Sequence, residues 1–250
     1  MTEVAAVVIP ARLQSSRLPR KVLADLHGAP LVQRTYEVAV RADVGPVTVL
    51  ADDPEVVAAV EGFGGRVLMT DPELESGTAR IASVVDALDA GVIVNLQGDA
   101  PLTDPEVVAR AAQEAAASDA DVTLPVYRIS DAGDVHDPNV VKVVRGHGGR
   151  VLYCSRSAVP HVRDAADPQD WVTRAGFWGH VGLYAYRADF LRGFADLPDS
   201  PLEATERLEQ LRWLEAGLRL HAFEVEPQGP SVDTQAQLDR VRALFDGSSS

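Results

Sequence analysis

The sequence of 250 residues contains a single cysteine, Cys154. One thiol excludes a disulfide within the chain and fits a reducing compartment. Cys154 ends a short strand-like run, residues 151–154, so we expect a small buried hydrophobe there rather than a nucleophile. Long apolar runs are missing too, since none approaches the roughly 20 residues that span a bilayer. The N-terminus lacks the basic start and apolar core of a signal peptide, and we expect a cytoplasmic protein.

Positive charge is scarce. The chain has 23 Lys and Arg against 37 Asp and Glu, which gives a formal net charge of −14. So acidic a surface disfavours nucleic acid and anionic membranes as partners. The composition is otherwise that of a soluble globular protein. We expect one domain over residues 1–246, followed by a disordered tail at 247–250.

Two common nucleotide-binding signatures are also missing. The first strand-like run is not followed by G-x-G-x-x-G, and the chain contains no Walker A sequence. These absences argue against a dinucleotide-binding oxidoreductase and against a P-loop nucleotide hydrolase.

Strand and helix patterns alternate through the first half of the chain. Helices are predicted over 31–42, after Pro54, from the apolar face that spans residues 81–88, and after a capping box of Thr103 and Glu106. The intervening apolar runs predict strands at 4–9, 47–50, 67–69, 92–96 and 122–126. This alternation predicts an α/β fold with a mostly parallel central sheet.

The second half of the chain lacks this regular alternation of strand and helix patterns. A turn at 145–150 between two apolar runs predicts a hairpin, and residues 160–179 are irregular. Trp171 and Trp178 lie in the irregular segment, where they could form a mobile lid or simply pack. Further strands are predicted at 181–186 and 220–225, and Leu208, Leu211, Leu214 and Leu218 predict a helix. Thr234 and Gln237 could cap a final helix.

A basic loop follows the first predicted strand. Arg12, Arg17 and Lys21 lie in this loop, against the acidic average of the chain. Ligands bind at the carboxyl ends of strands in open α/β sheets. Three cations there suit a triphosphate, whose negative charge must be neutralised before a nucleophile can approach it. The alternative is a solvated basic loop without a ligand.

Two aspartates also follow predicted strands. Asp99 ends the 92–96 run in a glycine turn and should lie at the same sheet edge as the basic loop. A carboxylate there suits Mg²⁺, which takes one or two protein carboxylates beside substrate phosphates. Asp233 precedes a helix and could be a second ligand, or it could only stabilise the helix dipole. Ser76, Gly77 and Thr78 precede another helix and offer backbone donors, which is a weak signal alone.

These segments resemble the CMP-KDO synthetases, the 3-deoxy-manno-octulosonate cytidylyltransferases. The resemblance starts at Pro10, Ala11 and Arg12 and continues through the rest of the basic loop. It extends in order over nearly the whole chain, through residues 69–70, 76–78, 95–99, 137–144, 153–156, 180–184, 200–203, 208–212 and 232–234.

The resemblance implies a glycosyltransferase-A-like nucleotidyltransferase fold and a smaller acceptor and dimerisation lobe within about 127–190 of a homodimer. It implies that CMP passes from CTP to an acidic acceptor with release of pyrophosphate. Nucleotide binding would involve Ala11, Arg12, Arg17, Lys21, Ser76, Gly77 and Gln97, with Lys21, Arg12 and Asp99 catalytic. Asp99 and Asp233 would hold Mg²⁺. The acceptor would face Gln97, Arg156, His180, Tyr184, Glu209 and Gln210.

Four departures from the family pattern lie toward the acceptor, and one of them is His161, where the family commonly has tryptophan. Ala100 stands where the family has a carboxylate, Gly179 where it has a basic residue, and Arg20 where it has a small one. An added cation and a lost anion favour a smaller or more negative acceptor than KDO. A phosphonate such as phosphonoformate is therefore the alternative acceptor. Two further hypotheses are that the protein is an inactive family member, or that it is a nucleotidyltransferase that uses UTP, GTP or ATP.

Overall fold

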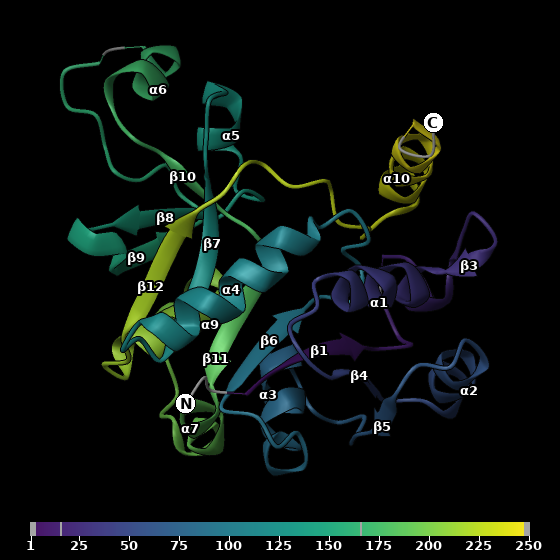
Figure 1. The fold of residues 1–250 in the computed structure, drawn as a ribbon. Helices are drawn as coiled ribbons and strands as arrows, with labels where there is room; N and C mark the ends of the chain where they lie inside the picture. Colours follow the sequence, from purple (N-terminus) through teal and green to yellow (C-terminus); the bar gives the residue numbers. More distant parts are fainter. Residues whose placement is uncertain (1–3, 16, 166, 248–250) are drawn as a thin grey trace. The chain divides into compact units, whose positions relative to one another are not determined.

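A computed structural model describes residues 4–15, 17–165 and 167–247. The chain, drawn as a ribbon in Figure 1, forms two compact units. The first contains Met1–Ala116, Leu183–Ala195 and Gln228–Ser250, and the second contains Ala117–Gly182 and Asp196–Pro227. The second unit includes most of the 127–190 segment expected to form a lobe, but residues 183–190 belong to the first. Gly247 ends a helix, and the rest of the expected tail, 248–250, lies outside the described residues.

The sheet of the first unit is mostly parallel, as predicted. Its strand order is β5–β4–β1–β6–β11, and only β11 runs antiparallel to its neighbour. The central strands are apolar on both faces and buried, because helices pack alongside them. The bounds are β1 Ala5–Ala11, β4 Val47–Ala51, β5 Val67–Met69, β6 Val92–Leu96 and β11 Leu183–Arg187.

The helices of the first unit follow the predicted ones with two corrections. The face predicted over 81–88 is not one helix, since α3 ends at Ala82 and a short 3-10 turn, η2 (Val85–Ala87), follows. The cap of α4 is Asp104 rather than Thr103, because Pro105 takes the first helical position and the Asp104 carboxylate accepts from Glu106 N at 2.9 Å. The other elements are η1 Lys21–Leu23, β2 Asp25–Leu26, β3 Ala29–Pro30, α1 Leu31–Arg41, α2 Pro54–Gly62, α3 Gly77–Ala82, α4 Pro105–Ala117, α7 Ala188–Arg192 and α10 Gln235–Gly247.

The sheet of the second unit is mixed, which the prediction of a mostly parallel sheet did not anticipate. β7 (Val122–Arg128) pairs in parallel with β12 (Leu220–Glu224) and antiparallel with β10 (Trp178–His180). β10 in turn pairs with β8 (Lys142–Arg145), and β8 forms the predicted hairpin with β9 (Val151–Ser155). The strand predicted at 181–186 begins two residues later, at Leu183, and belongs to the first unit.

The irregular segment packs within the second unit. The ring of Trp171 is buried against His136, His161 and Phe177. Trp178 lies under the guanidinium of Arg145, 4.4 Å from its ring centre. Both tryptophans therefore have packing roles. The other elements of this unit are α5 Ala132–His136, η3 His147–Gly149, η4 Pro168–Asp170, α6 Trp171–Arg174, α8 Pro201–Glu206 and α9 Glu209–Glu215. The 3-10 turn η5 (Phe194–Asp196) contains the chain boundary between the two units, because Ala195 belongs to the first unit and Asp196 to the second.

No helix in the described part of the chain has both the length and the hydropathy of a membrane span.

Cys154 is buried in β9, and burial raises the pKa of its thiol to about 12. The thiolate is the reactive form, so a buried thiol with such a pKa is inert near neutral pH. We expect the native protein to resist a thiol reagent such as DTNB at pH 8, whereas the protein unfolded in guanidinium reacts fully. Stoichiometric labelling of the folded protein, measured by absorbance, would contradict this placement.

Candidate functional site

A cleft of about 300 Å³ lies in the first unit at the carboxyl ends of β1 and β6. The ends of these two parallel strands approach each other closely. A Cβ on Gly98 would lie 2.9 Å from the Pro10 carbonyl oxygen, so only glycine allows this approach. The cleft is lined by Pro10, Arg12, Gln14, Ser15, Arg17, Lys21, Val22, Gly77, Gln97, Gly98 and Asp99.

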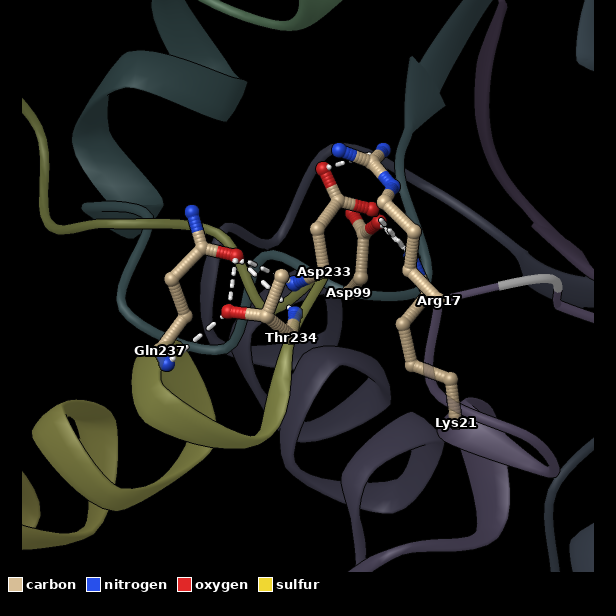
Figure 2. Close-up of polar contacts among 6 residues, drawn as sticks. All are labelled: Arg17, Lys21, Asp99, Asp233, Thr234 and Gln237. Carbon is tan, nitrogen blue, oxygen red and sulfur yellow. Dashed lines mark hydrogen bonds and ion pairs between the residues drawn. The ribbon is translucent and has the colours of Figure 1, made fainter.

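Lys21 and two aspartates meet beside this cleft. Lys21 Nζ donates to Asp99 Oδ2 at 2.5 Å and to Asp233 Oδ1 at 2.8 Å. The other oxygen of Asp233 pairs with Arg17 Nη2 at 3.0 Å. Figure 2 shows the two carboxylates side by side with the basic side chains reaching them. The predicted juxtaposition of the basic loop with Asp99 and Asp233 is therefore present.

Backbone and helix-cap contacts bring Asp233 to this place. Val232 N donates to the Asp99 carbonyl at 2.9 Å, which joins the 232–234 segment to the turn after β6. The Gln237 amide oxygen accepts from the backbone N–H groups of Asp233 and Thr234 at 2.9 and 3.0 Å (Figure 2). Thr234 Oγ1 accepts in return from Gln237 N at 3.3 Å. The predicted cap of the last helix is confirmed, and it holds the backbone of Asp233.

The charges of the cluster depend on one another. Burial disfavours the ammonium, but Asp99 and Asp233 outweigh it and raise the pKa of Lys21 above its ordinary value. Burial also raises the pKa of Asp99, against the opposing attraction of Lys21. The lysine therefore stays charged, and its charge favours the ionised form of the buried Asp99 carboxylate.

The donor set fits a magnesium ion that arrives with phosphates. The described residues contain no group of three or more His, Cys, Asp or Glu side chains that could hold a metal alone. Mg²⁺ does not need such a group, since it keeps several waters and takes one or two carboxylates beside substrate phosphates. Asp99 and Asp233 offer such a pair, and their present sharing of one ammonium shows that they can share a cation.

The other expected nucleotide residues border the same cleft or lie beside it. Arg12 donates to the Glu75 carbonyl at 3.1 Å and remains nearly half exposed. Gln97 Nε2 donates to Asn95 Oδ1 at 3.1 Å, which fixes the amide in the cleft wall. Ser76 caps α3 through Ala79 N at 3.1 Å, and Ala11 is buried at the end of β1.

Comparisons with known proteins agree with this geometry. A family profile described as cytidylyltransferase matches residues 6–220. The 3-deoxy-manno-octulosonate cytidylyltransferase of Escherichia coli is 42% identical over 242 residues, with 96% of each chain covered. The corresponding enzyme of Vibrio parahaemolyticus is 45% identical, with 95% of this chain and 96% of that one covered.

The chain belongs to the 3-deoxy-manno-octulosonate cytidylyltransferase family. A solved structure of CMP:2-keto-3-deoxy-manno-octonic acid synthetase complexed with CTP is 42% identical and has a TM-score of 0.91, with 98% of this chain and 99% of that chain covered. The inositol-1-phosphate CTP transferase of T. maritima shares the fold alone, at 15% identity and a TM-score of 0.64, over 98% of this chain and 96% of that one.

Two departures from the family pattern have structural partners in this cytidylyltransferase. The Arg20 guanidinium pairs with the carboxylate of Glu55, so its charge is already balanced. Gly179 lies opposite Tyr127 in the β10–β7 ladder, where a Cβ would be 2.4 Å from the tyrosine ring. A basic side chain at this position would require the Tyr127 ring to move. Arg20 and Gly179 therefore each contact a neighbour within their own unit.

Most of the expected acceptor residues lie in the second unit. Arg156 Nε, Nη1 and Nη2 donate to the carbonyls of Glu206, Pro138 and Arg207, at 2.7, 2.9 and 3.4 Å. The Glu206 carboxylate also accepts from Arg156 N at 2.7 Å. Three of the five guanidinium donors are thus committed to the backbone. Arg156 therefore holds the ends of three segments together in this unit.

The remaining acceptor candidates have different environments. Burial lowers the pKa of His180 to about 4, so this imidazole is neutral at physiological pH. Gln210 is buried near the start of α9, directly after Glu209. Tyr184 is in β11 of the first unit, and its ring stacks on Tyr186 at 5.8 Å.

Lys142, within the run 140–144, is a buried residue whose role the sequence pattern did not predict. Its side chain is completely buried, and Nζ donates to the carbonyls of Asp137, Val140 and Arg156 at 2.7, 2.6 and 2.7 Å. Burial lowers the pKa of this ammonium. Like the Arg156 side chain, Lys142 helps to hold the Arg156 backbone in place. The position of a lysine inside an apolar strand could have predicted a buried, hydrogen-bonded ammonium.

Replacement of Gln237 tests how Asp233 is positioned. Gln237→Ala removes the acceptor for two backbone N–H groups, so we expect it to cost about 1 kcal/mol of stability and about 2–4 °C in Tm. Gln235→Ala is the matched control in the same helix. It loses only an exposed contact to Asp239 at 2.8 Å and should cost a few tenths of a kcal/mol. Equal Tm losses for the two variants would contradict the capping role.

Proposed function

We propose that the protein transfers CMP from CTP to KDO and releases pyrophosphate. The identity of 42–45% to 3-deoxy-manno-octulosonate cytidylyltransferases over about 96% of the chain supports this acceptor. The structural likeness to a synthetase complexed with CTP supports the nucleotide. The observation that carries the proposal is the meeting of Lys21, Arg17, Asp99 and Asp233 beside one cleft.

The basic side chains would bind the triphosphate. In the proposed reaction, the anomeric hydroxyl oxygen of KDO attacks the α-phosphorus of CTP, in line with the departing pyrophosphate. Negative charge then develops on the leaving group. Arg12, Arg17 and Lys21 are cations that line the cleft and would stabilise that charge.

Asp99 and Asp233 would hold Mg²⁺. When bound, the ion reduces the repulsion between the two anionic substrates and activates the attacking oxygen. Lys21 bridges the two carboxylates and keeps both oriented toward one point. The carboxylates therefore need no rearrangement relative to each other to share a cation.

The candidate acceptor residues, as the family resemblance implies them, are Gln97, Arg156, His180, Tyr184, Glu209 and Gln210. One argument for a phosphonate acceptor loses force, because the added cation Arg20 is paired with Glu55. Only Ala100 remains as a reason to prefer a more negative acceptor. These observations favour KDO. Family membership also supports a cytoplasmic homodimer.

Pyrophosphate release tests the function directly. We expect turnover with CTP, Mg²⁺ and KDO, and little or none when UTP, GTP or ATP replaces CTP, when phosphonoformate or another sugar acid replaces KDO, or when EDTA removes the metal. No release with any acceptor would indicate an inactive family member. Faster turnover with phosphonoformate than with KDO would identify the alternative acceptor.

Substitution of the carboxylates tests the metal assignment in the same assay. Asp99→Asn and Asp233→Asn should each lower kcat by about 100-fold or more, because a neutral amide is a poor ligand for Mg²⁺. Asp104→Asn is the matched control. It makes the same change in the same unit, and asparagine is an equally good cap for α4. Near wild-type rates for Asp99→Asn or Asp233→Asn would remove the metal role.

A further inference from the structure

Asp52 connects the loop after β1 to a buried arginine. It directly follows β4, the neighbour of β1 in the sheet, and Ala11 pairs with Ala51 where the two strands end. Its Oδ1 accepts from Leu13 N at 2.9 Å. Its Oδ2 lies 3.8 Å from Arg80 Nη2 and 3.9 Å from Arg12 Nε. One carboxylate therefore contacts a backbone amide and two guanidinium groups.

The backbone N–H of Leu13 anchors this loop to Asp52. Leu13 lies between Arg12 and Gln14, both of which line the cleft. Over the described residues 12–15 and 17–19, it is the one backbone N–H group with a hydrogen bond to another described residue. Fixing this amide fixes the backbone on which Arg12 and Gln14 are carried.

Arg80 in turn forms an ion pair with Asp52, at 3.8 Å and without a hydrogen bond. Its side chain is completely inaccessible, and its Nη1 donates to the Asp71 carbonyl at 3.1 Å and to Thr70 Oγ1. Thr70 Oγ1 donates to the Ala51 carbonyl at 2.8 Å, beside Asp52. Burial lowers the pKa of Arg80, and the Asp52 carboxylate opposes that shift. Among the described residues, Asp52 is the only carboxylate within 4.0 Å of this guanidinium.

We propose that Asp52 is a positioning residue for CTP binding: Arg80 pairs with its carboxylate, and the carboxylate holds the Leu13 amide and so the loop that carries Arg12. This inference rests on the proposed function, because it assigns the loop to the triphosphate. Asp52 itself does not line the cleft. The arrangement also links α3, which begins at the cleft with Gly77, to the loop after β1.

Steady-state kinetics with CTP as the varied substrate test the proposal. Asp52→Ala should raise the KM for CTP about tenfold, as expected for loss of a coupled contact, while the KM for KDO changes less than about twofold. Asp52→Ala also leaves Arg80 buried without its counter-charge, which threatens folding. The double variant Asp52→Ala/Arg80→Met removes both charges and still lacks the loop anchor. It should show the same rise in the KM for CTP.

Two further variants separate positioning from a general loss of stability. Asp52→Asn keeps an oxygen that can accept from Leu13 N, so it should restore the KM for CTP to within about threefold of wild type. Asp53→Ala makes the same truncation one residue later. It removes the cap of α2, a 2.8 Å bond to Glu55 N, and should lower Tm without changing the KM.

The outcomes are distinguishable from failure of the proposed function. Wild-type protein that releases no pyrophosphate from CTP would refute the proposed function and the inference together. With an active wild type, an unchanged KM for CTP in the double variant would overturn the positioning role alone. The same follows if Asp52→Asn is as impaired as Asp52→Ala, or if Asp53→Ala raises the KM equally.

Discussion

The sharing of the Lys21 ammonium between Asp99 and Asp233 is the interaction on which the site depends. The three residues come from the start, the middle and the end of the chain. They can meet because β1 and β6 are parallel neighbours whose ends approach at Gly98, and because Val232 pairs with the Asp99 carbonyl. The cluster balances charge without a ligand and presents two carboxylates to an arriving cation. The α/β sheet thus places the two carboxylates of the proposed metal site side by side without a bound substrate.

Much of the first unit could be predicted from the sequence. Its strands are short apolar runs buried on both faces, and acids or bases directly after such runs must gather at one sheet edge. This reasoning found Lys21, Asp99 and Asp233 and the cap by Gln237. It overestimated the length of α3, because apolar spacing over 81–88 does not distinguish one long helix from a short helix followed by a 3-10 turn.

The partners of buried charged residues could not be predicted from sequence patterns. Asp52 follows a strand just as Asp99 does, but its role depends on Leu13 and on Arg80, which is far along the chain and fully enclosed. Lys142 is held by three carbonyls that only the folded second unit brings together. The partners of Arg20 and Gly179 were equally hidden, since pairing with Glu55 and packing against Tyr127 are tertiary contacts. A departure from a family motif therefore acquires its meaning only from its neighbours.

The most direct measurement of the central claim is a crystal structure of the protein with CTP and Mg²⁺. The proposed function requires the triphosphate to lie in the cleft between the basic loop and Gln97, with the metal bound to Asp99 and Asp233. It also requires Arg12, Arg17 and Lys21 to contact phosphate oxygens. A nucleotide bound elsewhere, or a metal that touches neither aspartate, would contradict it.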